Sequence, residues 1–436
     1  MNVLRRGDPG YERARTDCVW NGRIADRFPD VIVQIDSEQD VPAAVQLARE
    51  RDMQIGVRSG GHSWAGSHLR DGGMLMDLSR LTELSVDAEA GTAVVQPGVR
   101  GSDLVATLRG HELFFPVGHC QGVALGGYLL QGGFGWLSRI FGPACMSVTA
   151  IDVVTADGEV LHADEHDHPD LYWAARGAGP GFFGVVTRFH LRLHPWPRVA
   201  MNSVYLYPAE LLEEVFGWAR EIGPAVARSV EMMVFLQRPG GDQRLIGVTG
   251  PVLAASEEEA REALAILDTC PVLDRAIAVN ACMPADFADL VGASRLLFPD
   301  GNRFAVDNMW TSAPVSELVP GLRTIAQTLP PEPSHAMWMN WGPSPERPDM
   351  AYSVEDDVYI ALYASWTDLA DDARYASWPA QRMREMEHLA TGIQLADENL
   401  GVRPARFVSE ANLQRLDEIR AIYDRDRRFH SWMGRS

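Results

Sequence analysis

The sequence has few cysteines, a shortage of basic residues and no long apolar run. Its 436 residues include only five cysteines, which is too few for a disulfide framework, and an odd number leaves at least one thiol unpaired. Lys and Arg number 39 against 59 Asp and Glu, so the formal net charge is -20. Nucleic acids and anionic membranes need clustered basic residues, which argues against both as partners. No apolar run reaches the roughly 20 residues of a membrane-spanning helix.

The N-terminal region also lacks the pattern of an export signal. Arg5 and Arg6 are followed by Gly7-Asp8-Pro9-Gly10, where a signal peptide would have an apolar stretch. We therefore expect a cytoplasmic protein with reduced thiols. The chain is 46% hydrophobic and 22% charged, as in ordinary globular proteins, and its length allows one to three domains with a large core.

Apolar periodicity predicts an α+β organisation for the first 195 residues. A strand at 31–34, a helix at 37–51 capped by Ser37 and a strand at 55–58 form a β-α-β unit. Further strands are predicted at 73–77, 93–96 and 150–155, and a further helix at 102–109.

Two prolines in His194-Pro195-Trp196-Pro197 mark a probable change of domain, since each interrupts regular structure. Helices are then predicted at 209–222, 256–267 and 413–423, and an alternating strand at 358–366. Tyr359 and Tyr363 share one face of that strand, because side chains alternate along it.

A glycine turn with a histidine follows the strand at 55–58. In Val57-Arg58-Ser59-Gly60-Gly61-His62-Ser63, successive backbone N–H groups of the Gly-Gly turn can form a concave array of donors that suits a phosphate. Taken alone, the same pattern is also typical of a tight turn with a solvated histidine.

A second segment, from Phe115 to Gly135, is rich in glycine and contains Cys120. So many glycines in an apolar stretch indicate close approach of the backbone to a large flat or anionic ligand, since each glycine weakens regular structure. A glycine-rich packing segment is the alternative. The segment has no G-x-G-x-x-G motif opening a β-α-β unit, which disfavours a dinucleotide-binding Rossmann site.

These two segments, with Asp170-Leu171-Tyr172-Trp173-Ala174-Ala175-Arg176-Gly177 and Phe183-Gly184-Val185-Val186-Thr187, resemble the FAD-linked oxidases of the vanillyl-alcohol oxidase (PCMH-type) superfamily. The berberine bridge enzyme-like branch is the most similar. The resemblance covers about Val31 to Pro195. It implies an FAD-binding domain at 1–197 and 400–436, with an inserted substrate domain at 198–399 of antiparallel sheet flanked by helices.

The resemblance also implies a bicovalent flavin, in which His62 bonds the 8α-methyl carbon and Cys120 bonds C6. A cysteine suits this role because its thiolate is nucleophilic. Arg58 to Ser63 would hold the pyrophosphate, and Gly184 to Val186 would lie along the adenosine. The implied FAD contacts are Val57, Arg58, Ser59, Gly60, Gly61, Ser63, Gly98, Val117, Gly118, Gly122, Val123, Gly126, Gly127, Gly133, Gly135, Gly184, Val185, Val186 and Asn412.

The implied reaction is hydride transfer from an alcohol or amine carbon of a small organic, sugar or secondary-metabolite substrate to flavin, followed by reoxidation by O2 to H2O2. Val123 favours an oxidase, because oxygen-using members tend to have a small residue there. Candidate proton acceptors are Tyr359, Tyr363 and Glu410, with Tyr352 as a further tyrosine. A phenol in this role needs a nearby cation to lower its pKa.

Three alternatives remain open: an oxidative cyclase of a biosynthetic pathway, a dehydrogenase of the same fold and a degenerate flavin-binding protein. Trp310, Trp338 and Trp341 would suit an aromatic substrate, although core packing is the usual role of indoles. His162, His166 and His168 lie close together in the sequence, as metal ligands can. We expect an exposed loop there and no metal.

Overall fold

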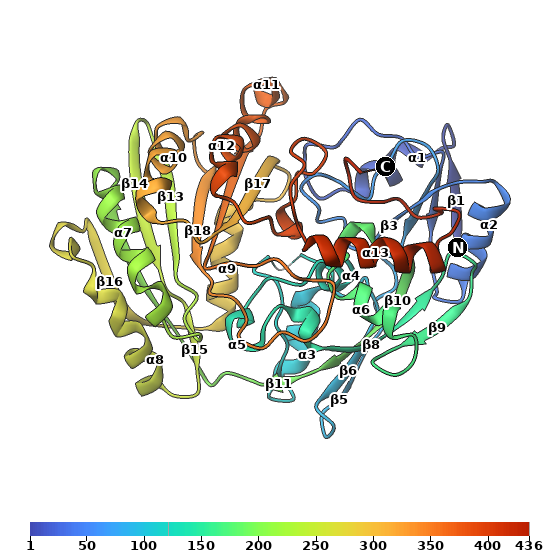
Figure 1. Cartoon of the computed structure of the whole chain (residues 1–436), viewed down its shortest axis with the longest axis horizontal. Helices are drawn as coiled ribbons and strands as arrows, with labels where there is room; N and C mark the ends of the chain where they lie inside the picture. Colours follow the sequence, from blue (N-terminus) through green and yellow to red (C-terminus); the bar gives the residue numbers. More distant parts are fainter. Residues whose placement is uncertain (121, 436) are drawn as a thin grey trace. The chain divides into compact units, whose positions relative to one another are not determined.

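The computed structural model describes residues 1–120 and 122–435, which divide into two compact units (Figure 1). Unit 1 comprises Met1–Trp196, Glu346–Ser353 and Val408–Ser436; unit 2 comprises Pro197–Pro345 and Val354–Phe407. The division expected from the sequence needs two corrections. Residues 346–353 belong to unit 1, and residues 400–407 belong to unit 2.

Unit 1 contains a four-stranded, a five-stranded and a two-stranded sheet. Its strands are β1 (Asn2–Arg5), β2 (Val31–Gln34), β3 (Ile55–Arg58), β4 (Met74–Asp77), β5 (Leu84–Asp87), β6 (Thr92–Val95), β7 (Leu113–Phe114), β8 (Val148–Val154), β9 (Val160–Ala163), β10 (Val185–Arg192) and β11 (His194–Pro195). Its helices are α1 (Tyr11–Asp17), α2 (Asp40–Glu50), α3 (Gly101–Arg109), α4 (Leu125–Leu130), α5 (Ser138–Phe141), α6 (Pro169–Ala175) and α13 (Glu410–Tyr423), with 3-10 turns η1 (Ala144–Ser147) and η2 (Gly179–Gly181).

The first sheet has the order β1-β2-β4-β3, in which β2 and β3 run parallel to the central strand β4. The predicted β-α-β unit is present, with β4 between its two strands. Helix α2 begins at Asp40 and not after Ser37, because the Asp40 carboxylate accepts the Ser37 backbone N–H at 3.2 Å. Its buried face is the predicted set Val41, Ala44 and Val45 with Ala48.

The C-terminal tail returns to β3, the strand that leads into the glycine turn. The Ile55 N–H donates to the Arg428 carbonyl oxygen at 2.7 Å, and the His430 N–H donates to the Ile55 carbonyl oxygen at 3.0 Å. Asp424 is buried and its carboxylate accepts the backbone N–H groups of Arg428 and Phe429. Strand β3 is therefore held on one side by β4 and on the other by the tail.

Residues 346–353 also dock in unit 1, through Tyr352. Its ring fills the position that a side chain would take at Gly132, and its backbone N and Cα fill that position at Gly177; φ is 106° and 133° at these glycines. The Tyr352 N–H donates to the Arg176 carbonyl oxygen at 2.8 Å. Tyr352 packs with Cys145 and Met350 in a small buried cluster. This phenol is therefore part of the packing of unit 1.

Unit 2 is built on an eight-stranded antiparallel sheet of order β15-β12-β14-β13-β18-β19-β17, with β16 pairing β12. Its strands are β12 (Val199–Pro208), β13 (Met233–Gly240), β14 (Gln243–Thr249), β15 (Val252–Ala254), β16 (Ala278–Ala285), β17 (Arg303–Thr311), β18 (His335–Asn340) and β19 (Val358–Trp366). Its helices are α7 (Leu212–Ile222), α8 (Glu257–Leu264), α9 (Phe287–Leu297), α10 (Val315–Thr328), α11 (Asp372–Tyr375) and α12 (Trp378–Met386), with 3-10 turns η3 (Ala209–Leu211), η4 (Gly223–Ala225), η5 (Ala265–Thr269), η6 (Leu273–Arg275), η7 (Leu369–Asp371), η8 (Glu387–Leu389) and η9 (Leu395–Asp397).

Helices α7, α10 and α12 cover one face of this sheet (Figure 1). Strand β19 shows the predicted alternation: Ile360, Leu362 and Ala364 point into the core beneath the helices. Trp338 belongs to the same core, and its indole N–H donates to the Asn340 side-chain oxygen at 2.7 Å. The architecture confirms the expected α+β fold with an antiparallel sheet and flanking helices.

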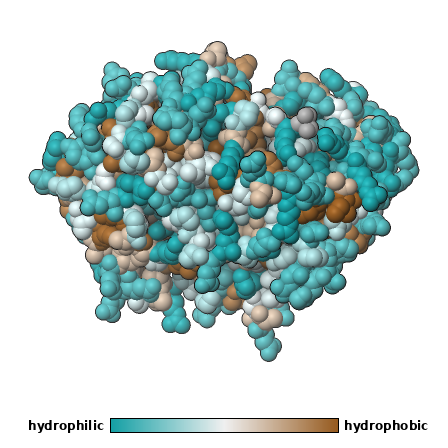
Figure 2. All heavy atoms as spheres, viewed as in Figure 1, coloured by the Kyte–Doolittle hydropathy of each residue, from teal (hydrophilic) through white to brown (hydrophobic). Residues whose placement is uncertain are grey.

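The visible face in Figure 2 is mostly hydrophilic, with apolar residues scattered over it. Such a surface is usual for a globular protein, because charged residues lie mostly outside the core. Across the described residues, no helix combines the length and the apolar character that crossing a membrane requires.

The buried ion pair of unit 2 gives a test of the fold. Arg403 and Asp307 have side chains 5% and 1% exposed and lie 2.5 Å apart. Arg403→Met should lower the free energy of unfolding by about 3–5 kcal/mol, because it leaves a buried carboxylate without its cation. Arg323→Met removes the exposed pair with Glu213 and should cost about 1 kcal/mol or less. Thermal unfolding of both variants measures the difference, and equal melting temperatures would contradict it.

Candidate flavin site

The glycine turn after β3 is shaped by an arginine beneath it. Gly61 has φ 72°, a conformation that favours glycine, and a side chain there would collide with the Cys18 carbonyl oxygen. The Arg58 guanidinium donates to Asp77 at 2.6 Å and to the Gly60 carbonyl oxygen at 3.2 Å. Arg58 therefore links the turn to Asp77 at the end of β4.

The glycine segment contacts this turn at backbone distance. A Cβ on Gly60 would lie 2.7 Å from the Cβ of Ala124, and a Cβ on Gly126 would lie 2.7 Å from the Ser59 hydroxyl oxygen. That hydroxyl accepts the Gly127 N–H at 3.2 Å. The structure thus brings together the two segments that the sequence singled out, with His62 in one and Cys120 in the other.

The His62 imidazole is half-buried and held by two indoles. Its ring stacks on Trp20 with centroids 4.1 Å apart and meets Trp64 edge-on at 5.7 Å. The backbone N–H of Trp20 donates to the Gly61 carbonyl oxygen at 3.0 Å, so Trp20 is bonded directly to the glycine turn. Neither tryptophan belongs to a recognisable motif, so only the folded structure reveals its contact with His62.

The environment of Cys120 differs from that of the buried cysteines. Burial raises the pKa of the Cys18 thiol to about 12, so this thiol stays protonated and unreactive. Cys145 is fully buried and packs in the Tyr352 cluster. Cys120 is half-buried, at the start of the segment that contacts the turn. It is therefore the thiol of this unit that is accessible to a ligand.

The assigned glycines differ in their surroundings. Gly133 and Gly135 of the segment, and Gly98 before it, are packed against protein atoms, since a Cβ on each would lie 2.6 Å or less from its nearest neighbour. A Cβ on Gly127 would be in ordinary contact with the Gln131 side chain, at 3.6 Å, and a Cβ on Gly122 would meet no atom of the described residues within 4 Å. Packing explains the first three glycines, whereas Gly122 leaves open space two residues after Cys120.

The glycine positions test whether FAD fits. A flat ring system requires a surface without projecting side chains, and Gly122 presents bare backbone two residues after Cys120, on the segment that packs against the glycine turn. The residues present fit the group.

The remaining assigned contacts lie on β10 and α13. Gly184 permits close packing of β10 on β8, since its Cβ would lie 2.8 Å from a Val153 methyl group. Val185 and Val186 are buried at the start of β10. The Asn412 side-chain NH2 donates to the carbonyl oxygens of Met350 and Ala351 at 3.0 and 3.1 Å, so this amide anchors α13 to the 346–353 segment.

The candidate proton acceptors lie in different surroundings. Glu410 is exposed in the first turn of α13. Tyr359 and Tyr363, on one face of β19, both donate their hydroxyls to Oδ2 of Asp397, the second at 2.7 Å. Burial and then the Asp397 charge raise the pKa of Tyr359 well above its usual value. A tyrosine that acts as a base needs a nearby cation to stabilise its phenolate. Tyr359 has the Asp397 carboxylate next to it instead, so its hydroxyl keeps its proton and donates a hydrogen bond.

Asp397 is the functional candidate that the sequence did not reveal. It ends the short turn η9 and is half-buried, whereas the two tyrosines are 0% and 4% exposed. Its backbone carbonyl accepts the Asn308 side chain at 2.7 Å, which fixes the turn. Trp310 packs on Tyr359 with ring centroids 5.0 Å apart and on Trp341 at 5.8 Å, so these indoles support the cluster.

Comparison with known proteins agrees with the site. An FAD-binding domain model matches residues 29–164. The FAD-linked oxidoreductase nodO of Hypoxylon pulicicidum is 34% identical, over 97% of this chain and 95% of its own length. The chain belongs to the FAD-linked oxidoreductases. The resemblance found in the sequence is therefore confirmed, and FAD is the cofactor of its family.

Solved structures share the fold of this FAD-linked oxidoreductase over nearly its whole length. 6-Hydroxy-D-nicotine oxidase from Arthrobacter nicotinovorans matches with a TM-score of 0.85 at 23% identity, covering 99% of this chain and 96% of the other. The berberine bridge enzyme-like protein 1 of Physcomitrella patens matches with a TM-score of 0.86 at 20% identity, covering 100% and 97%. The fold is thus the PCMH-type, berberine bridge enzyme-like fold.

Two neighbouring glycines of α4 give a matched test of the site. Gly126→Ala should lower the melting temperature, with a cost of about 1–3 kcal/mol, because its methyl group would displace Ser59 or Pro97 from the turn. Gly127→Ala meets only an ordinary contact with Gln131 in the oxidoreductase without flavin, so its effect on the stability of that form should be neutral or favourable by up to about 1 kcal/mol. Differential scanning fluorimetry of flavin-free protein distinguishes the two, and equal destabilisation would contradict the contact.

Proposed function

We propose that this FAD-linked oxidoreductase is an oxidase that removes a hydride from an alcohol or amine carbon of a small organic, sugar or secondary-metabolite substrate. We further propose that His62 and Cys120 attach the flavin covalently. The observation that carries the proposal is the contact of the His62 turn with the Cys120 segment, with open space at Gly122.

Several features support attachment at these two residues. His62 is half-buried and is oriented by stacking on Trp20, and Cys120 is a half-buried thiol two residues before Gly122, which has open space beside it. Two covalent bonds would fix the ring system in one orientation toward the substrate.

We propose Asp397 as the proton acceptor of the reaction. Two phenol hydroxyls donate to one of its oxygens, which fits an ionised carboxylate, since such an oxygen can accept both donors. The hydroxyls also fix the orientation of the carboxylate. Tyr359 and Tyr363 are positioning residues in this proposal, because the raised pKa of Tyr359 keeps its proton in place.

FAD held by the glycine turn and the Cys120 segment would supply the hydride-accepting chemistry, with O2 as the final acceptor and H2O2 as the product of an oxidase. The protein binds and orients the substrate, and Asp397 takes the proton from its hydroxyl or amine group. Val123 is half-buried beside Gly122, and its small side chain supports access of O2. Fold neighbours named as oxidases, such as 6-hydroxy-D-nicotine oxidase and chitooligosaccharide oxidase, are consistent with this reaction class.

Covalent attachment is tested by acid precipitation followed by intact-mass measurement. The precipitated protein should keep its yellow colour and one FAD of added mass. Cys120→Ala and His62→Ala should each retain the flavin through the other residue, and the double variant should release it. Loss of the whole flavin from the wild-type pellet would contradict both attachments.

Cys282→Ala is the matched control, since Cys282 is equally half-buried but lies in unit 2. It should leave the mass and the colour of the pellet unchanged. Oxygen consumption during turnover separates the oxidase from a dehydrogenase of the same fold, whose reduced flavin would be reoxidised slowly in air.

The role of Asp397 is tested with Asp397→Asn, on a substrate found by flavin bleaching in an anaerobic screen of alcohols, sugars and amines. The variant should bind flavin normally but lower kcat by about 10²- to 10⁴-fold, the usual contribution of a general base. Tyr359→Phe should lower kcat less, because it removes a positioning hydrogen bond. Asp242→Asn, at a fully exposed carboxylate of unit 2, serves as the control. Unchanged kcat in Asp397→Asn would refute the assignment.

A further inference from the structure

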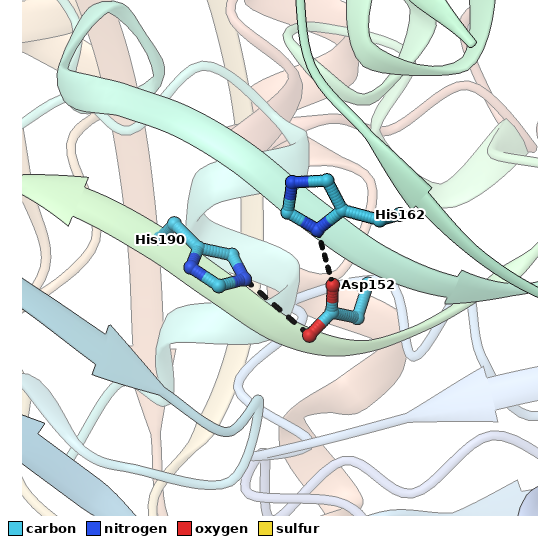
Figure 3. A group of neighbouring side chains, drawn as sticks. All are labelled: Asp152, His162 and His190. Atoms are coloured by element: carbon cyan, nitrogen blue, oxygen red, sulfur yellow. Dashed lines mark hydrogen bonds and ion pairs between the residues drawn. The ribbon is translucent and has the colours of Figure 1, made fainter. Parts of the chain in front are cut away.

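Three neighbouring strands of unit 1 bring two imidazoles onto one carboxylate. Asp152 lies on β8, His162 on β9 and His190 on β10, and β8 is the middle strand of the three. Figure 3 shows both histidine rings directed at the Asp152 side chain. Among the described residues, this is the group of His, Cys, Asp and Glu side chains with metal-ligating geometry.

The register of the sheet explains the cluster. His162 is the direct partner of Asp152 in the β8–β9 pair. In the β8–β10 pair Asp152 is opposite Arg188, so His190 is a diagonal neighbour on the same face. Diagonal neighbours in a sheet are within reach of long or aromatic side chains. The pairing of the three strands is therefore sufficient to bring the three side chains close to one another.

The distances are close to those of a coordination site. Nδ1 of His162 lies 2.7 Å from Oδ1 of Asp152, and Nε2 of His190 lies 3.3 Å from Oδ2. The three ligand atoms all lie within 4.8 Å of one another. Ligands about 2.0–2.2 Å from a zinc ion in a tetrahedron are roughly 3.3–3.5 Å apart. The Nδ1 of His162 must move away from the Asp152 oxygen to reach that spacing, and its side chain is 48% exposed, which leaves room for the shift.

We propose that Asp152, His162 and His190 form a binding site for a divalent transition metal of the zinc type. Two imidazoles and one carboxylate are the ligand set of open zinc sites, in which water takes the fourth position. The Asp152 and His190 side chains are 26% and 29% exposed, so water can reach the ion. A bound ion would link β9, β8 and β10 across one face of the sheet.

The surrounding charges permit a cation. Arg188, the nearest arginine on this face, is paired with Glu38 at 2.7 Å and with Glu83 at 3.2 Å, so its charge is balanced. Asp164 adds a second carboxylate, 3.8 Å from Nε2 of His162. Such a carboxylate next to the free nitrogen of a metal-bound imidazole helps to orient the ring.

The site differs from the cluster that the sequence indicated. His166 and His168 lie near His162 in the chain, but the ligating group consists of His162 with Asp152 and His190. His166 is 81% exposed and lies 3.5 Å from Glu165, its neighbour in the chain. His166 therefore provides a matched control.

Isothermal titration of chelator-treated, flavin-loaded full-length protein with Zn²⁺ alone tests the proposal. One ion per chain should bind with a dissociation constant on the order of micromolar, and excess Zn²⁺ should raise the melting temperature, because a ligand at 100 times its dissociation constant stabilises by about 2.7 kcal/mol. His162→Gln and His190→Gln should each weaken binding at least tenfold and abolish the thermal shift.

His166→Gln should bind Zn²⁺ like the wild type. His162→Gln replaces a half-exposed side chain, so its melting temperature without metal should be close to that of the wild type, which shows that lost binding is not lost folding. The proposal is overturned if the wild type binds no Zn²⁺ in the micromolar range, if His162→Gln binds as tightly as the wild type, or if His166→Gln loses binding to the same degree.

Discussion

The contact on which the flavin unit depends is the approach of two backbone segments at Gly60 and Gly126. A methyl group on either glycine would overlap an atom of the other segment, so neither position tolerates a side chain at the observed spacing. The turn carries the half-buried His62 and the segment carries the half-buried Cys120, the two residues that we propose as flavin attachments. The C-terminal tail supports the turn by pairing with Ile55, at the start of the strand that enters the turn. The return of the last residues to β3 thus gives this strand a bonded neighbour on its second side, opposite β4.

Much of the local structure could be predicted because its signals are local. Alternation along Val358–Trp366 identified β19 and the shared face of its tyrosines, and apolar spacing identified the buried face of α2. The prediction of Ser37 as the helix cap was wrong, because α2 begins at Asp40 after Gln39 and no side chain caps it. The docking of residues 346–353 in unit 1 has no local signal. It depends on Tyr352 filling the space above Gly132 and Gly177, which lie far away in the sequence.

Asp397 illustrates why functional residues in the middle of the chain could not be predicted from the sequence. A single aspartate in a short turn carries no motif, and its importance arises only when Tyr359 and Tyr363 direct their hydroxyls at it from β19. The same geometry changes the meaning of the tyrosines. A phenol next to a carboxylate holds its proton more tightly, so the residues that the sequence offered as bases become donors. Two residue types that look interchangeable as proton acceptors are thereby assigned different roles by one contact.

The cluster of Asp152, His162 and His190 depends on strand register in the same way, and its energetics limit how tightly it can hold an ion. Without metal, both imidazoles already pair with the Asp152 carboxylate, and exposure to water keeps the contribution of each pair to about 1 kcal/mol or less. A metal must replace both bonds, so only the surplus of its coordination energy appears as affinity. The half-exposed His162 ring must also be fixed in a new position, which adds an entropic cost. An open, moderate-affinity site that exchanges its ion readily is the form of metal binding that this arrangement can support.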